Sequence, residues 1–304
     1  MLRKLRALGV GVTLGMLLLG VSESSASAQT NLSAAEIVGK NVEARGGLEK
    51  WRSVQTMTMS GKMGAGGNRR PTQSPPIPGK PKNAAPAAPG EEVQLPFLME
   101  LKRPGKVRIE IQFNGQTAVQ IYDGMNGWKL RPFLGRHEVE PYTAEEIKGA
   151  ALSSDLDGPL VDYAAKGNKV ELEAIEKVEG NDCYKLKITL KNGAVTHAWI
   201  DAKTFLEAKM EGQPKLIDGV NHPVEVYYRD YRDVNGLKVP FLLETKVVPV
   251  RTGPHANNVG QSEKTVIENV VVNPKLDDAI FTRASLDAPS APAKPATAAA
   301  KPKS

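Results

Sequence analysis

Alternation of apolar and polar residues is the dominant pattern of this chain. In residues 106–113 every second side chain is apolar, Asn114-Gly115 follows, and a second alternating run leads into Tyr122–Trp128. A period of two places alternate side chains on the same side of a strand, and Asn-Gly supplies the positive φ angles of a tight turn. The stretch therefore predicts a β-hairpin with one apolar face.

The same alternation recurs on both sides of this hairpin. It runs through residues 56–60 and 97–101, and it returns between residues 170 and 272, where Asn192-Gly193 and Asn235-Gly236 supply further turns. About a dozen short strands separated by turn signals are typical of one large antiparallel sheet. We therefore expect a mainly β protein.

Helical signals occur only near the start and in the middle of the chain. Ser33–Glu36 is a capping box before apolar residues at helical spacing, and Gly46-Gly47 predicts the end of this helix. Thr143–Glu146 is a second capping box, and Asp157 with Pro159 predicts another helix that runs to Gly167. These helices are too few to form a second layer. We expect them to act as a lid or plug on an incomplete, half-closed antiparallel β-barrel.

Both ends of the chain and one insertion fall outside the strand pattern. Basic residues precede the apolar run Leu8–Val21, and Ala26-Ser27-Ala28 follows it, which is the layout of a cleaved signal peptide over residues 1–28. No cysteine lies near this site, so we expect no lipid anchor. Residues 64–92 and 284–304 are rich in Pro, Ala and Lys and have little to bury, which predicts disorder. One folded domain over residues 29–283 remains.

The net charge of +6 does not indicate a nucleic-acid partner, because the excess of Lys and Arg is concentrated in residues 1–28, 62–92 and 284–304. The remaining core is nearly neutral and lacks the basic surface that a phosphate backbone requires. The lysines of the tail, Lys294, Lys301 and Lys303, predict at most a weak, salt-sensitive tether to an anionic surface. The alternative is a solvated tail without a role.

Signatures of catalysis and metal binding do not occur in the sequence. The histidines at 137, 197, 222 and 255 each stand alone, and there is no nucleophile elbow and no pair of cysteines. Asp155-Leu-Asp-Gly158 resembles the start of a calcium loop, but the later ligand positions are missing. We interpret Cys183 as a structural thiol, with a redox or intermolecular role as the alternative. We therefore predict a non-enzymatic protein without catalytic residues, metal or cofactor.

Several longer motifs together resemble one protein family. They are Gly46–Trp51, Tyr122–Trp128, Trp199–Asp201 with Phe205–Glu207, Tyr228–Phe241 and Asn273–Phe281. Over most of residues 33–283 the chain resembles the outer membrane lipoprotein-sorting proteins, the LolA/LolB-like superfamily. The resemblance implies an incomplete antiparallel barrel with a helical lid, which shields acyl chains of lipoproteins crossing the periplasm. The chain departs from the well-studied carriers in its Pro-rich insertion and its tail, and no position matches their lid-fastening arginine.

The apolar faces of adjacent predicted strands define the candidate ligand site. We expect its cavity to be lined by Met57, Met59, Phe97, Met99, Ile109, Ile111, Val119, Ile121 and Trp128, with Leu160 and Val161 on the lid. An apolar cavity of this kind suits a lipid or a lipoprotein acyl chain, whereas the alternative is a dry, packed core. The expected function is that of a monomeric periplasmic carrier without a nucleic-acid partner. The alternative is an envelope sensor or scaffold that binds a membrane protein, to which the exposed insertion points.

Overall fold

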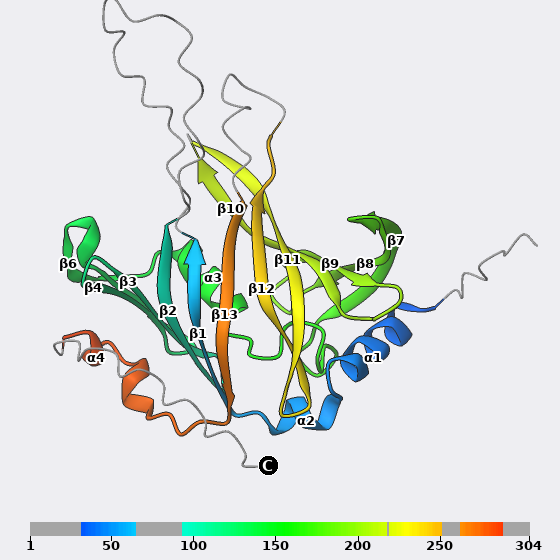
Figure 1. Cartoon of the computed structure of the whole chain (residues 1–304), viewed down its shortest axis with the longest axis horizontal. Helices are drawn as coiled ribbons and strands as arrows, with labels where there is room; N and C mark the ends of the chain where they lie inside the picture. Colours follow the sequence, from blue (N-terminus) through cyan, green and yellow to red (C-terminus); the bar gives the residue numbers. More distant parts are fainter. Residues whose placement is uncertain (1–31, 65–92, 218, 251–261, 288–304) are drawn as a thin grey trace, which may run out of the picture. The chain divides into compact units, whose positions relative to one another are not determined.

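A computed structural model of the chain describes residues 32–64, 93–217, 219–250 and 262–287. These residues form one 13-stranded antiparallel sheet in the order β6-β5-β4-β3-β2-β1-β13-β12-β11-β10-β9-β8-β7 (Figure 1). The edge strands β6 and β7 do not pair with each other, so the sheet does not close. The prediction of a mainly β, incompletely closed antiparallel architecture is therefore confirmed. The predicted signal peptide, nearly all of the insertion and most of the tail lie outside the described residues.

The strands are β1 (Thr56–Gly64), β2 (Gln94–Lys102), β3 (Lys106–Phe113), β4 (Gln116–Tyr122), β5 (Gly127–Arg131), β6 (Arg136–Pro141), β7 (Lys169–Val178), β8 (Asn181–Thr189), β9 (Val195–Asp201), β10 (Glu207–Ile217), β11 (Val220–Val234), β12 (Leu237–Val247) and β13 (Ser262–Val272). The helices are α1 (Ala34–Ala44), α2 (Leu48–Ser53), α3 (Ala144–Ser153), α4 (Ala284–Asp287) and the 3-10 turns η1 (Pro132–Leu134) and η2 (Asp278–Phe281). Strand β6 and helix α2 were not expected from the sequence. No helix in the described part of the chain is both long and apolar enough to cross a membrane.

The two predicted capping boxes are both present. The Ser33 and Thr143 side chains accept hydrogen bonds from the backbone N–H of Glu36 and Glu146, and each glutamate bonds back to the cap residue. The helix predicted between Asp157 and Gly167 does not form, and this stretch is a series of turns. Its backbone reaches positive φ at Gly158 (77°) and Asp162 (52°), which a right-handed helix does not allow. The middle of the chain therefore supplies one lid helix, not two.

Cross-strand register assigns the side chains of β1 to β5 to two faces. Met59 lies opposite Met99, Met99 opposite Ile109, and Ile109 opposite Gln120 of β4. Directly paired residues share a face of the sheet. We call this side the inner face, because Lys129, opposite Gln120, points to helix α3 and bonds Glu146 there.

Three of the predicted lining residues, Val119, Ile121 and Trp128, lie on the opposite, outer face. The two-residue turn leaves Phe113 opposite Gln116 and Ile111 opposite Ala118, so the odd-numbered residues of β4 point away from those of β3. Val119 and Ile121 pack instead against Phe281 and Leu286 of the C-terminal segment, with Trp128 beside them. The prediction of one continuous lining is therefore wrong for these three residues.

The C-terminal segment is folded beyond the predicted boundary at residue 283. Helix α4 ends at Asp287, and Leu286 is buried in the cluster on the outer face. Arg108 of β3 fixes this segment, since its guanidinium donates to the Ile280 carbonyl and to Ser285 Oγ, each at 3.0 Å. The tail therefore begins no earlier than residue 288.

Candidate functional site

Six predicted lining residues lie together on the inner face of β1, β2 and β3. Met57 and Phe97 are buried, and the other members, Met59, Met99, Ile109 and Ile111, are half-buried. Met59, Met99 and Ile109 are direct neighbours on three adjacent strands, which makes one apolar row across the sheet. An apolar row that retains accessible area can contact an apolar ligand.

Helix α3 lies over the inner face and is held by few contacts. None of its residues is buried. At its N-terminal end Glu146 is bonded to Lys129 of β5, and toward its C-terminal end Gly149 lies against the Gln213 side chain of β10. Burial alone would raise the pKa of Glu146, but the hydrogen bonds from Lys129 and Thr143 lower it, so the carboxylate stays charged. Helix α3 thus contacts strands from the two halves of the sheet, through an ion pair at β5 and close packing at β10, as a lid would.

A buried ionic cluster fixes the turn segment that follows α3. Asp157, with 2% of its side chain exposed, accepts hydrogen bonds from Arg103 Nη2 and Lys166 Nζ, each at 2.6 Å. Lys166 Nζ also lies 2.8 Å from Asp155 Oδ1 and 2.7 Å from the Gly158 carbonyl. The stretch Asp155–Gly158, which resembles the start of a calcium loop in the sequence, thus binds the Lys166 ammonium group with its oxygen atoms.

The two carboxylates of this cluster have pKa values shifted in opposite directions. Burial raises the pKa of Asp155 to about 6, and its hydrogen bond with Asp157 adds to the shift. Burial also opposes ionisation of Asp157, but hydrogen bonds from Asp155, Arg103 and Lys166 lower its pKa. Asp157 is therefore the charged centre of the cluster, and Asp155 is the group that takes up a proton.

Arg45, which follows α1, joins this cluster to the strands of the second half of the sheet. Its Nη1 atom donates to the Asp157 carbonyl at 2.9 Å and lies 3.2 Å from Glu207 Oε1. Its guanidinium also stacks over the Trp51 ring at 4.5 Å. No local sequence pattern predicts the roles of Arg45 and Arg103, because their partner Asp157 lies 112 and 54 residues away along the chain. Lys166 lies nearer to its partners, but it contacts them through turns that the sequence pattern did not predict.

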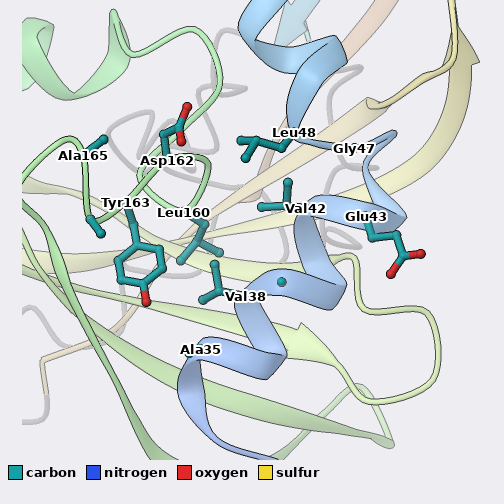
Figure 2. Close-up of a pocket in the computed structure, with 12 residues that line it drawn as sticks. Ala35, Val38, Val42, Glu43, Gly47, Leu48, Leu160, Asp162, Tyr163 and Ala165 are labelled. Carbon is teal, nitrogen blue, oxygen red and sulfur yellow. The ribbon is translucent and has the colours of Figure 1, made fainter.

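The two predicted lid residues, Leu160 and Val161, belong to this turn segment and are 1% and 0% exposed. Leu160 lines a groove of about 520 Å³ between α1 and the turn segment, whereas Val161 does not. In Figure 2 the Val38, Val42 and Leu48 side chains are directed toward the same space as Leu160. We call this the α1 groove; it is lined by Ala35, Val38, Gly39, Val42, Glu43, Gly47, Leu48, Leu160, Asp162, Tyr163, Ala164 and Ala165.

Cys183 lies on the outer face in a small cluster with Val178 and Trp199. It is fully buried, and burial raises the pKa of its thiol to about 11, so the reactive thiolate is not populated at neutral pH. Among the described residues, no group of three or more His, Cys, Asp or Glu side chains is arranged to hold a metal ion. His255 lies outside the described residues.

Comparison with solved structures identifies the architecture, whereas no family model and no curated protein matches the sequence. A putative outer membrane lipoprotein-sorting protein domain from Vibrio parahaemolyticus superposes with a TM-score of 0.50 at 12% identity, over 84% of this chain and 98% of that one. This chain has the lipoprotein-sorting fold. The fold expected from the sequence resemblance is thereby confirmed, and at this identity the likeness concerns the fold alone.

Two further structures are similar to the lipoprotein-sorting fold of this chain. A LolA superfamily protein from Nitrosomonas europaea has a TM-score of 0.49 and 14% identity, over 84% of this chain and 99% of that one. A DUF1329 family protein from Desulfovibrio piger has a TM-score of 0.49 and 15% identity, over 83% of this chain and 98% of that one.

Proposed function

We propose that the protein is an exported, non-enzymatic carrier that binds lipid or lipoprotein acyl chains against its inner face. The observation that carries the proposal is the row formed by Met59, Met99 and Ile109, which is only half-buried although helix α3 lies over this face. Removing apolar surface from water stabilises by about 25 cal/mol per Å², so an acyl chain that covered this row would gain free energy that folding leaves unused.

The composition of the row also suits a ligand of variable shape. Methionine side chains are unbranched and have three rotatable bonds, so Met59 and Met99 can adapt to chains of different length or saturation. Helix α3 buries none of its residues and can move aside without exposing a core of its own. Entry beneath α3 is therefore compatible with a stable sheet.

The chemistry of the buried charges supports a binding role over a catalytic one. Asp155, Asp157 and Glu207 each have an ion-pair partner, and Lys166 is surrounded by oxygen atoms that satisfy its ammonium group. These groups fix the turn segment and α1. In this proposal the carrier acts as a monomer in the periplasm, with acyl chains as ligands and an envelope membrane protein as the partner for loading or release.

The test compares two neighbouring positions of β2 that face opposite sides of the sheet. Met99 lies on the inner face and Leu98 on the outer face, and both are half-buried. We expect purified wild-type protein to yield lipid on extraction and mass spectrometry, and to bind a fluorescent fatty-acid probe. Met99→Lys should weaken probe binding at least ten-fold, whereas Leu98→Lys should retain it.

Absence of both extracted lipid and probe binding in the wild-type protein would refute the carrier. Capture of a membrane protein by a lipid-free protein would instead favour the envelope sensor or scaffold. Circular dichroism melting of both lysine variants distinguishes lost binding from lost folding.

A further inference from the structure

The α1 groove is separate from the inner face of β1 to β3. Its lining residues come from α1, the connection to α2, the first residue of α2 and the turn segment 160–165, and none comes from a strand. We infer that the α1 groove is a second ligand site, which takes one linear hydrocarbon chain with a cationic or neutral head group. This inference does not rest on the proposed function.

The shape of the α1 groove suits a linear apolar occupant. Its volume of about 520 Å³ lies within the range of small-molecule sites. Val38 and Leu160 are almost fully buried and form its apolar base. Ala35, Gly39 and Glu43 are spaced four residues apart, so they form one stripe along the exposed side of α1. A chain that follows this stripe would run parallel to the helix axis.

Gly39 is the feature that keeps the groove open. Glycine is among the poorest helix formers, yet Gly39 lies in the interior of α1. A Cβ at this position would have no neighbouring atom within 4 Å, so packing does not require glycine here. The φ angle of Gly39 is not positive, and the backbone does not require glycine either. What the missing side chain does provide is free space inside the groove.

The walls of the groove are already in place without a ligand. Lys166 and Asp157 hold the turn segment, and Arg52 holds Asp162 through two hydrogen bonds of 2.7 and 2.8 Å. A site whose walls are fixed in advance binds without the entropy cost of ordering them. These contacts distinguish the groove from a gap between mobile surfaces.

The charges on the groove decide which head group fits. The charged residues that line it are Glu43 and Asp162, and both are acidic. Hydrogen bonds from Arg52 lower the pKa of Asp162 and keep it ionised, but the guanidinium also compensates its charge, so Glu43 carries the uncompensated negative charge. Within the described part of the chain Glu43 is exposed and has no ion-pair partner, and in Figure 2 its carboxylate points away from Leu160, outside the apolar part of the groove. This carboxylate attracts an ammonium head group and repels a fatty-acid carboxylate.

The experiment measures binding by isothermal titration calorimetry in the full-length Met99→Lys background, where the inner face is blocked. The probes share one chain length and differ in head group: dodecylamine, dodecyl maltoside and laurate, each below its micelle-forming concentration. We expect dodecylamine and dodecyl maltoside to bind and laurate to bind at least ten-fold more weakly. Gly39→Leu should reduce binding of the first two at least ten-fold, whereas Lys40→Leu, at the neighbouring exposed position outside the groove, should leave it unchanged.

Two further variants complete the test. Ala35→Leu fills the N-terminal end of the stripe and should also reduce binding of dodecylamine and dodecyl maltoside. Glu43→Gln should remove most of the preference for dodecylamine over laurate. Equal binding by Gly39→Leu, Ala35→Leu and their Met99→Lys parent would overturn the site, and equal binding of dodecylamine and laurate by the parent would overturn the head-group assignment. Because these comparisons are made within the Met99→Lys background, failure of the inner-face proposal leaves them valid.

Discussion

Arg103 and Asp157 form a salt bridge of 2.6 Å in which the carboxylate has only 2% of its side chain exposed. The arginine belongs to the turn between β2 and β3, and the aspartate belongs to the turn segment after α3. Arg103 also donates to the Val54 carbonyl at 2.8 Å. This one guanidinium therefore connects α2, the first half of the sheet and a wall of the α1 groove.

Removal of the buried charge should destabilise the fold. We expect Asp157→Asn to lower the free energy of unfolding by about 3 kcal/mol, because Arg103 and Lys166 would lose their shared partner in a buried setting. Urea denaturation followed by circular dichroism measures the change. The matched control is Asp182→Asn, which removes a largely exposed salt bridge with Lys177. This substitution should lower the free energy of unfolding by less than about 1 kcal/mol. Equal losses in the two variants would contradict the role of the cluster.

The raised pKa of Asp155 predicts a pH dependence of stability. A carboxyl group whose pKa is about 6 in the folded state and 3.8 in the unfolded state stabilises the fold below pH 3.8, and this contribution is lost as pH rises through about 6. As the pH rises from 4.5 to 7.5, the free energy of unfolding of the wild-type protein should therefore fall by roughly 1 to 2 kcal/mol relative to that of Asp155→Asn. Urea titrations of both proteins across this range measure the slope. A constant difference would show that Asp155 has an ordinary pKa in the folded state, and a slope of the opposite sign would show a lowered pKa; either result would contradict the prediction.

Ile109 and Ile121 lie on opposite faces of the β3–β4 hairpin, so their substitution should have different consequences. Ile121 is fully buried against the C-terminal segment, so Ile121→Ala should cost about 2 to 4 kcal/mol of stability and leave probe binding unchanged. Ile109 is half-buried on the inner face, so Ile109→Ala should cost less stability and weaken fatty-acid probe binding. Thermal melting and probe titration of both variants test the assignment. Loss of probe binding in Ile121→Ala alone would place the ligand on the outer face.

The Lys129–Glu146 pair predicts how firmly α3 covers the inner face. Lys129→Met removes the buried cation, and the amides of residues 144–153 should then exchange with solvent roughly ten-fold faster, because α3 has no buried residue to retain it. Hydrogen–deuterium exchange with mass spectrometry measures this rate. Lys148→Met, which removes an exposed pair on the same helix, is the control and should leave exchange unchanged. Similar exchange in both variants would contradict a lid held by Lys129.

The strand pattern and the capping boxes could be predicted from the sequence because they depend on neighbouring residues. The face of Val119 and Ile121 could also have been predicted, since a two-residue turn after Phe113 pairs odd with even positions across the hairpin. The missing helix after Asp157 could not, because the conformation of that segment depends on Arg45 and Arg103, whose contacts form only in the folded chain. The α1 groove could not be predicted from the strand pattern either, because its walls come from a helix and a turn segment that are far apart in the sequence. Gly39 within the predicted helix was the one feature of the sequence that could have indicated it.

The buried environment of Cys183 has a practical consequence for following the lid. The thiol is fully buried and its pKa is raised to about 11, so labelling reagents that need an exposed thiolate will not react with it. The native chain can therefore serve as its own background for site-directed spin labels, without removal of a cysteine. Labels at Lys148 on α3 and at Leu216 near the tip of β10, both largely exposed, would report the distance between lid and sheet by pulsed electron paramagnetic resonance as acyl chains are added.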